Sequence, residues 1–180
     1  MKAQETKLKD AYVITTPRYD DERGFFIESF SSQRFRDAIG EDIEFVQDNH
    51  SKSSKGVLRG LHYQTQHPQG KLVRCTQGAV YDVLVDLRKS SPTFGEWIGI
   101  ELNDNNQMVW IPEGFAHGFY TLSDEAEFEY KCTDYYHPES METLMWNDPE
   151  LDIDWCLDGE PILSAKDEVG KSFKDCYKYE

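Results

Sequence analysis

The chain has 180 residues and a formal net charge of −15, from 34 acidic and 19 basic side chains. This length suits one domain with a sizeable core and is short for two, so we expect residues 1–180 to form a single domain. The acidity argues against nucleic acid and against an anionic membrane as partners. A hydrophobic content of 38% argues against a disordered chain.

Targeting signals and cysteine motifs are missing from the sequence. The first residues lack the apolar core of a signal peptide, and no stretch approaches the roughly 20 apolar residues of a membrane span. We therefore expect a cytoplasmic protein. The four cysteines stand singly, without a CxxC pair, which favours reduced structural thiols over a zinc knuckle or a redox dithiol.

A spacing of two between apolar residues dominates the chain and predicts strands with one buried face. Gly, Pro, Asn and Asp turn signals separate the strand candidates. In chain order these are residues 24–29, 57–63, 71–75, 79–88, 97–102, 107–111 and 127–133. Many short strands at such intervals predict a β-sandwich or barrel.

Two of these segments predict the direction of individual side chains. In 79–88 the odd positions are all apolar, so Asp82, Asp86 and Arg88 are expected together on the opposite face. In 127–133 Tyr130 belongs to the apolar set, which turns it inward. Its hydroxyl would then need a hydrogen-bond partner.

Helical signals are few. Phe35, Ala38 and Ile39 have helical spacing and Gly40 is a stop signal, which predicts a helix over 32–39. The segment 164–167 could open a C-terminal turn. The predicted architecture is therefore mainly β with a few short helices.

A stretch without acidic residues lies between Asp48 and Asp82 and holds three of the five histidines. Its basic residues are Lys52, Lys55, Arg59, Lys71 and Arg74. A locally basic stretch in an acidic chain suits an anionic ligand. The alternative is a chance run of charge.

Residues 112–117 have the pattern Pro-x-Gly-x-x-His, which matches the second sequence motif of cupins, small β-barrels in which this histidine points inward. Metal-binding cupins add a His-x-His motif and a downstream Glu, a ligand set suited to a divalent ion. Here Gln64 stands where the histidine after His62 would be, and no acid follows before Asp82. His67 is expected in a loop. We therefore expect no metal site in the barrel.

Ten short motifs occur in the order typical of the dTDP-4-dehydrorhamnose 3,5-epimerase family, which the chain resembles from about Tyr12 to Asp167. They are DERGFF (21–26), QDNHS (47–51), RGLHYQ (59–64), QGKLVR (69–74), SPTFG (91–95), IPEGFAHGF (111–119), YK (130–131), YY (135–136), WNDP (146–149) and SAKD (164–167). The resemblance implies a cupin-type jelly-roll β-barrel that forms a homodimer, needs no cofactor and acts on a dTDP-4-keto-6-deoxy sugar.

The chemistry of such a substrate explains which residues are needed. The carbons beside the keto group, C3 and C5, carry acidic hydrogens, so epimerisation requires a base on one face, a group that stabilises the enolate, and an acid on the other face. The resemblance implies that His62 is the base and that Asp167 orients it. It implies likewise that Tyr130 donates the second proton and that Lys71 stabilises the enolate oxygen.

Each of these four residues also has an ordinary structural interpretation. His62 and Tyr130 could be core residues whose polar atoms find a hydrogen bond. Lys71 could be an exposed lysine on an edge strand. Asp167 could complete a capping box with Ser164 at a helix start.

Contacts to the nucleotide are also implied by the resemblance. Arg23 and Arg59 would hold the pyrophosphate with their planar guanidinium groups, and Tyr136 would stack on the base. The other polar contacts matched to the family are Glu28, Gln47, Asn49, His117 and Lys166. The acidic residues of 139–142 do not align with a family contact and are left unassigned.

The implied reaction converts dTDP-4-dehydro-6-deoxy-D-glucose into dTDP-4-dehydro-L-rhamnose by two proton exchanges, a step in L-rhamnose biosynthesis for cell-surface polysaccharide. One alternative is a related enzyme that epimerises only C3 or only C5, or that isomerises the keto group. Another is a non-catalytic cupin that binds a sugar nucleotide, which would be expected to lack one of the four catalytic residues.

Overall fold

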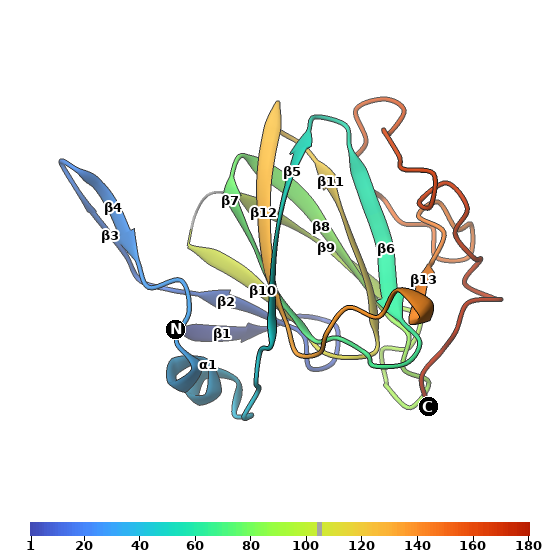
Figure 1. The fold of residues 1–180 in the computed structure, drawn as a ribbon, viewed down its shortest axis with the longest axis horizontal. Coiled ribbons are helices and arrows are strands. Elements are labelled where there is room, and N and C mark those ends of the chain that lie inside the picture. Colours follow the sequence, from blue (N-terminus) through green and yellow to red (C-terminus); the bar gives the residue numbers. More distant parts are fainter. Residues whose placement is uncertain (104–105) are drawn as a thin grey trace.

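Two antiparallel sheets that face each other make up most of the computed structural model, which describes residues 1–103 and 106–180 (Figure 1). The first sheet has the order β1 (Lys2–Glu5), β2 (Tyr12–Thr15), β10 (Gln107–Ile111), β7 (Lys71–Gln77), β12 (Glu125–Cys132) and β5 (Gln47–Ser54). The second sheet has the order β13 (Met141–Thr143), β6 (Leu58–Gln64), β11 (Phe115–Thr121), β8 (Ala79–Asp86) and β9 (Trp97–Asn103). The mainly β architecture predicted from the sequence is confirmed.

A separate hairpin of β3 (Arg18–Asp21) and β4 (Gly24–Ile27) projects away from the two sheets (Figure 1). Helix α1 (Ser32–Ile39) follows it and has the predicted bounds. Ser31 caps its first turn, and Gly40 ends it with a φ of 80°, a conformation that glycine adopts without steric cost. A short 3₁₀ helix, η1 (Pro138–Ser140), precedes β13.

The seven predicted strand segments coincide with β4, β6, β7, β8, β9, β10 and β12, with ends that differ by a few residues. The sequence did not reveal β5 or β11. All eight residues of β5 are polar, and every residue of β11 is buried, so neither shows apolar and polar residues in alternation. The short strands β1, β2, β3 and β13 were also not predicted.

The prediction that β8 has one polar face is wrong, because both faces of β8 are buried. Val80 and Leu84 pack in the core between the sheets, and the odd-numbered residues pack in a second core on the outer side. Asp82 and Asp86 are both fully buried. Buried carboxylates need hydrogen-bond partners, and each of them has one in a different part of the molecule.

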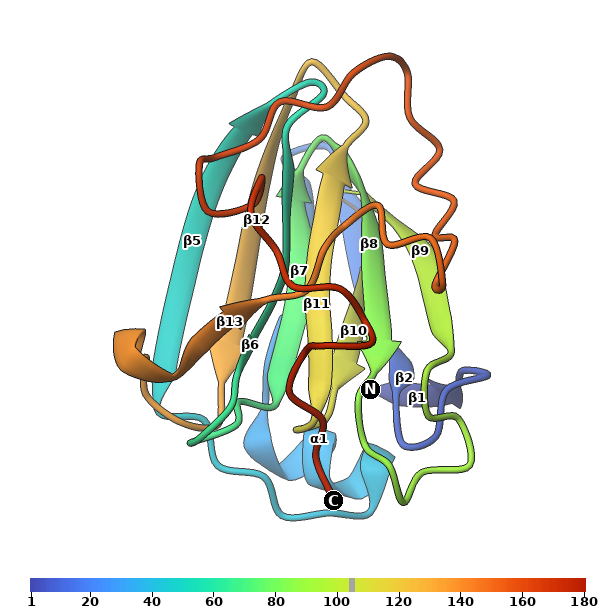
Figure 2. The ribbon, with the colours of Figure 1, turned by 90° about the vertical axis from the view of Figure 1, so that its right-hand side faces the viewer.

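The second core exists because the C-terminal segment, residues 144–180, crosses the outer face of the second sheet (Figure 2). Trp155 and Phe173 of this segment pack in that core with Leu58 and Leu61 of β6. The Leu58 amide donates to the Ile162 carbonyl over 3.0 Å. The segment therefore brings residues 162–167 beside β6.

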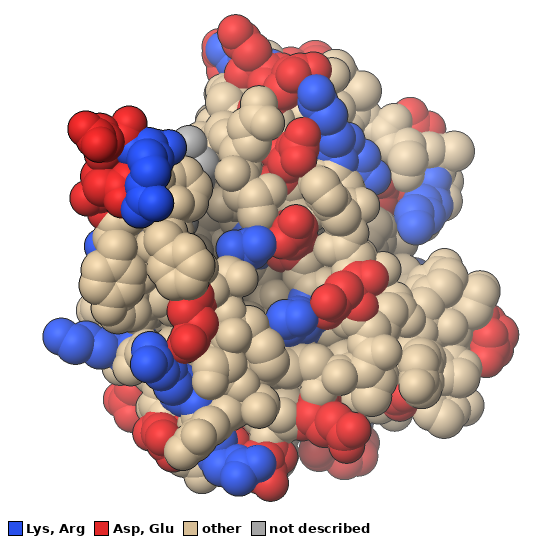
Figure 3. Space-filling model, turned by 60° about the vertical axis from the view of Figure 1, so that its left-hand side comes forward, with Lys and Arg blue, Asp and Glu red and all other residues tan. Residues whose placement is uncertain are grey.

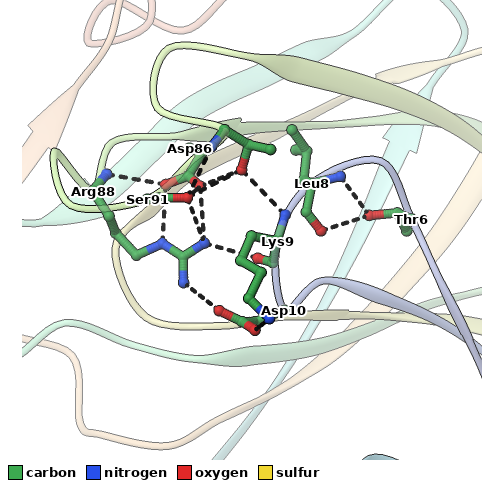
Figure 4. A network of polar contacts seen from close by, with 8 residues as sticks. Thr6, Leu8, Lys9, Asp10, Asp86, Arg88 and Ser91 are labelled. Carbon is green, nitrogen blue, oxygen red and sulfur yellow. Dashed lines mark hydrogen bonds and ion pairs between the residues drawn. The ribbon is translucent and has the colours of Figure 1, made fainter.

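Asp86 is the centre of a polar network that joins the β1–β2 and β8–β9 connections (Figure 4). One carboxylate oxygen accepts from the Arg88 backbone amide and Nε, both at 3.0 Å. The other accepts from Arg88 Nη2 at 2.8 Å, Ser91 Oγ at 2.6 Å and Thr93 Oγ1 at 2.8 Å. Arg88 also donates to Asp10. Burial raises the pKa of Asp86, but these hydrogen bonds outweigh it and hold the pKa below its ordinary value.

The surface carries both signs of charge, and acidic and basic side chains lie interspersed on the face shown in Figure 3. Three of the five basic residues in the predicted anion-binding stretch are paired with acids: Lys52 with Glu125, Lys55 with Asp158 and Arg74 with Glu129. The four cysteines, all among the described residues, form no disulfide bond. No helix of the described residues is long and apolar enough to cross a membrane.

Candidate active site

A cavity of about 560 Å³ is lined by strands of both sheets and by the C-terminal segment. Ten of the twelve residues assigned from the sequence line it: Gln47, Asn49, Arg59, His62, Lys71, His117, Tyr130, Tyr136, Lys166 and Asp167. These residues are up to 120 positions apart in the chain. The barrel therefore brings most of the predicted site together.

His62 lies on β6 and is bound to a buried carboxylate. Its Nε2 is 2.5 Å from Oδ1 of Asp167, which is 2% exposed. The carboxylate requires a hydrogen on Nε2, so Nδ1 is the ring nitrogen that can accept a proton. Burial lowers the pKa of His62, and the charges of Lys71 and Lys166 act in the same direction, against Asp167. The imidazole is therefore neutral near pH 7 and able to act as a base.

Asp167 is held on both of its oxygens. Oδ2 accepts from Ser164 Oγ at 2.6 Å, and Oδ1 also accepts from the Gly60 amide at 3.4 Å. Burial raises the pKa of Asp167, but the bonds from His62 and Ser164 outweigh it and keep the group ionised. Ser164 does open a turn, as predicted, since the Asp167 amide bonds its carbonyl at 2.9 Å. The turn and the His62 contact are therefore parts of one arrangement.

Lys71 is the first residue of β7, which lies between β10 and β12 rather than at an edge. Its side chain is buried, and burial lowers its pKa. Within the described residues its ammonium forms no hydrogen bond or ion pair. The preceding residue, Gly70, lies against Trp110, where a Cβ would be 2.6 Å from the ring. The interpretation of Lys71 as an exposed edge-strand lysine is wrong.

Tyr130 comes from β12 of the first sheet, whereas His62 comes from β6 of the second. Both line the cavity, so the two side chains enter it from facing sheets. The inward direction predicted for Tyr130 is confirmed. Burial raises the pKa of Tyr130, which keeps its hydroxyl protonated at neutral pH. In the described part of the chain this hydroxyl has no partner, so it remains free to bond a ligand.

A second histidine and carboxylate pair lies beside the first. His117 of β11 is the cross-strand partner of His62, and its Nε2 is 2.7 Å from Oδ1 of Asp82 on β8. Oδ2 of Asp82 is buried without a partner among the described residues. Sequence reasoning missed Asp82 as a site residue, because it expected only one face of 79–88, that of the odd positions, to be buried. The signal that could have found it is the buried histidine of the cupin motif, which needs an acceptor.

The remaining polar residues shape the rim of the cavity. Arg59 Nε donates to Ser53 Oγ at 3.0 Å, which fixes the guanidinium at the cavity wall. Gln47 bonds Asn49 through its Nε2 at 3.1 Å and accepts from the Tyr136 amide at 3.0 Å. The half-exposed ring of Tyr136 is thereby held at the cavity mouth.

Two predicted contacts, Arg23 and Glu28, do not line the cavity. Arg23 is at the turn of the projecting β3–β4 hairpin, is 85% exposed and pairs with Asp21 at 2.5 Å. Glu28 pairs with Arg34 at 3.2 Å. In the unassigned stretch, Glu142 bonds Tyr63 at 2.7 Å, outside the cavity.

The fold and the site together define a class: a cupin-type β-barrel whose cavity holds a carboxylate-bound histidine and a tyrosine on opposite walls. The comparisons with known proteins agree. Residues 5–175 match the family model described as dTDP-4-dehydrorhamnose 3,5-epimerase. The chain belongs to the dTDP-4-dehydrorhamnose 3,5-epimerase family.

Individual relatives cover nearly the whole chain. The dTDP-4-dehydrorhamnose 3,5-epimerase of Pseudomonas aeruginosa is 53% identical, over 97% of both chains. The structure of dTDP-6-deoxy-D-glucose-3,5-epimerase from Legionella pneumophila, in complex with dTDP-4-keto-L-rhamnose, has a TM-score of 0.94 at 51% identity and covers 97% of this chain and 93% of that one. A 3′-monoepimerase from Streptomyces bikiniensis in complex with dTDP-quinovose has a TM-score of 0.88 at 35% identity, over 94% of this chain and 86% of that one.

Proposed function

We propose that the protein epimerises dTDP-4-dehydro-6-deoxy-D-glucose at C3 and C5 to dTDP-4-dehydro-L-rhamnose, in L-rhamnose biosynthesis. The observation that carries this is the 2.5 Å contact between His62 and buried Asp167, in a cavity that also holds Lys71 and Tyr130. Relatives of about 50% identity that carry the name of this activity support it.

In the proposed mechanism, His62 removes a proton from the carbon beside the keto group, and Asp167 stabilises the imidazolium that forms. Negative charge moves to the keto oxygen, where the ammonium of Lys71 stabilises the enolate. Tyr130 then returns a proton from the facing sheet, which inverts the carbon. His62 then releases its proton to solvent and Tyr130 takes one up. The same steps at the second carbon complete the reaction, and the oxidation state of the sugar does not change.

Binding of the nucleotide is assigned to the cavity rim. The guanidinium of Arg59 and the ammonium of Lys166 suit the pyrophosphate, and the exposed ring of Tyr136 suits the base. Gln47, Asn49 and His117 would contact the polar groups between them. Each of these residues lines the cavity, which supports the proposal.

Arg23 and Glu28 lie away from the cavity of their own chain, and we propose that the protein is a homodimer in which the β3–β4 hairpin reaches the partner's cavity. The hairpin projects from the body and carries three exposed aromatic residues, Tyr19, Phe25 and Phe26, at 63%, 57% and 68%. Exposed aromatics on an extended arm favour burial against another chain. A second copy of this chain offers a cavity that lacks these two contacts.

Mixing two inactive variants tests this arrangement. His62→Ala and Arg23→Ala chains would be denatured together, refolded and assayed. If Arg23 acts across the interface, a mixed dimer regains one complete site, because the Arg23→Ala chain keeps its own His62 and receives Arg23 from its partner. No recovery of activity would show that Arg23 acts within its own chain, and an Arg23→Ala chain that is active by itself would show that Arg23 has no role.

Proton NMR tests the reaction itself. The substrate is incubated with chelator-treated protein in deuterium oxide, and the C3 and C5 signals are followed separately. Loss of both signals with inversion at both carbons is the expected result. Exchange at C3 alone would indicate a mono-epimerase such as the Streptomyces relative, and exchange at neither carbon would leave only binding.

A further inference from the structure

A cluster of potential metal ligands lies outside the cavity lining, where two loops meet. His67 follows β6, and Asp134 and His137 follow β12. One ligand atom from each of the three residues lies within 4.8 Å of the other two. The His67 and His137 rings are stacked with centroids 4.1 Å apart. Neither the proposed reaction nor the nucleotide contacts use these residues.

A buried glutamine holds the two loops in this arrangement. Gln64 is 2% exposed, and its Nε2 donates to the His67 carbonyl at 2.6 Å and to the Tyr135 carbonyl at 3.2 Å. Its Oε1 accepts from the His137 amide at 2.8 Å. One side chain therefore fixes the backbone of both loops, so the spacing of the ligand residues is set by the core.

The side chains of Asp134 and His137 each have one polar atom engaged outside the cluster. Oδ1 of Asp134 accepts from the Tyr135 amide at 2.7 Å, while Oδ2 is 3.4 Å from His67 Nδ1. A tetrahedral ion with bonds of about 2.0–2.1 Å separates its ligand atoms by roughly 3.3–3.4 Å. Nδ1 of His137 is 3.1 Å from Glu139 Oε1, which leaves Nε2 for the ion. A carboxylate behind a ligating histidine is the usual outer partner in metal sites.

We propose that His67, Asp134 and His137 bind a divalent transition-metal ion, Zn²⁺ in the first place, with water in the remaining position. Two imidazoles and a carboxylate suit zinc and its neighbours, whereas Ca²⁺ and Mg²⁺ prefer all-oxygen ligand sets. Because in-plane lone pairs of stacked rings do not meet at one point, binding of the ion by both histidines requires a rotation of at least one ring out of the stack. This site is separate from the cavity, where no metal is expected.

Such an ion would join the ends of the two strands that carry His62 and Tyr130. It would also fix the loop that holds Tyr136 at the cavity mouth, because Tyr136 lies between two of the ligands. The site stabilises this corner of the fold and takes no part in the proton transfers. The proposal therefore stands whether or not the proposed reaction is correct.

Calorimetric titration of the full chain tests the site. The protein is treated with chelator, dialysed and titrated with ZnCl₂, and Co²⁺ is used in parallel because its visible absorption reports the number and type of ligands. We expect one ion per chain and a rise in the thermal midpoint with Zn²⁺ but not with Mg²⁺. The His67→Ala and His137→Ala variants should each lose this binding. Glu139→Gln should weaken it about tenfold, the lower end for outer partners, since Glu139 is exposed.

His50→Ala is the matched control. His50 is also an exposed histidine beside carboxylates, with Nε2 3.0 Å from Glu127 and Nδ1 3.9 Å from Glu129. This variant should bind Zn²⁺ like the wild type. Zinc binding that survives in the His67→Ala and His137→Ala chains, or that disappears in His50→Ala, would overturn the proposal, as would no binding by the wild type.

Discussion

The cavity region and the Asp86 network both contain buried carboxylates, but they differ in how many of their polar atoms have hydrogen-bond partners within the protein. Each oxygen of Asp86 accepts at least two hydrogen bonds from within the protein. Among the described residues, the Lys71 ammonium and the Tyr130 hydroxyl of the cavity form no hydrogen bond, and Asp82 Oδ2, next to His117 of the cavity, is buried without a partner. A buried polar group without a partner costs free energy, and in the cavity a ligand could supply the missing partner of the Lys71 ammonium and of the Tyr130 hydroxyl.

One strand, β8, contributes a residue to each of these two regions. Asp82 and Asp86 are four residues apart on β8, on the same side of the strand, and both are fully buried. Asp82 bonds a histidine of the cavity, whereas Asp86 holds Arg88, which in turn bonds the β1–β2 connection. Substitutions in the two places should therefore change different measurements.

The largest effect is expected for His62→Ala. Removal of a general base typically costs 10²–10⁴-fold, and loss of exchange at both C3 and C5 should fall at about 10³-fold or more. The free energy of unfolding should fall by no more than about 1–2 kcal/mol, because Asp167 keeps its bonds from Ser164 and Gly60. Deuterium exchange by NMR and urea unfolding check the two parts. Wild-type exchange at either carbon would refute the role of the base.

Lys71→Met should lower activity and raise stability. Loss of the enolate stabiliser is expected to reduce kcat by roughly 10²–10³-fold. Replacing a buried ammonium that has no ion pair by an apolar side chain of similar length should stabilise the fold by on the order of 1 kcal/mol. Steady-state kinetics and denaturant unfolding give the two values. A variant that loses both activity and stability would show that Lys71 is a structural residue.

Tyr130→Phe should separate two events that the wild type couples. Since the tyrosine only returns the proton, the variant should still exchange hydrogen for deuterium through His62 while inversion stalls. The ring packing against Phe128 is unchanged by loss of the hydroxyl, so stability should stay near the wild-type value. Comparing the rate of exchange with the rate of product formation measures the separation. Equal loss of both rates would mean that Tyr130 has another role.

The same contrast explains how far the sequence alone could lead. Tyr130 was predicted to point inward because β12 alternates, and helix α1 was predicted because its spacing and its stop residue agree. Asp82 was missed because both faces of β8 are buried. The alternating residues of this strand therefore pack in two different cores, and neither face is exposed to solvent. The spacing of apolar residues indicates that a strand face is buried, but it does not indicate which segment of the chain covers that face.

Contacts between distant segments were beyond the residue pattern and came only with the family resemblance. Nothing local in 164–167 shows that this turn lies beneath His62; the packing of residues 144–180 on the second sheet places it there. The position of Arg23 is a further example. The residue pattern does not indicate that the β3–β4 hairpin, which carries Arg23, projects away from the two sheets, as the structure shows (Figure 1).

In the Asp86 network, the substitution Asp86→Asn should lower the stability of the fold. Breaking a buried ion pair costs about 3–5 kcal/mol when one partner stays behind, and the loss here should lie near 3 kcal/mol because Arg88 keeps Asp10. For a chain of this size that lowers Tm by roughly 10 °C. Activity per folded molecule should be unchanged, since Asp86 does not line the cavity. A Tm within about 2 °C of the wild type would contradict the role given to this network.

The smallest effect concerns acid stability. The pKa of Asp86 is lower in the folded protein than its ordinary value of 3.8. The stability it contributes is therefore complete above that value and is lost as the pH falls below 3.8 toward the folded pKa, because the unfolded chain binds the proton first. In Asp86→Asn, the plot of unfolding free energy against pH should be flatter than that of the wild type below pH 3.8.

Asp21→Asn is the control for that measurement. The pKa of Asp21 is also lowered, by its bonds from Arg23, but this pair is exposed to solvent. Solvent and salt screen such a pair, so its contribution to stability is small. Urea titrations between pH 2 and 6 should therefore give Asp21→Asn the slope of the wild type and Asp86→Asn the flatter one. Parallel curves for all three proteins would mean that protonation of Asp86 does not contribute to the loss of stability in acid, although both of its oxygens accept hydrogen bonds.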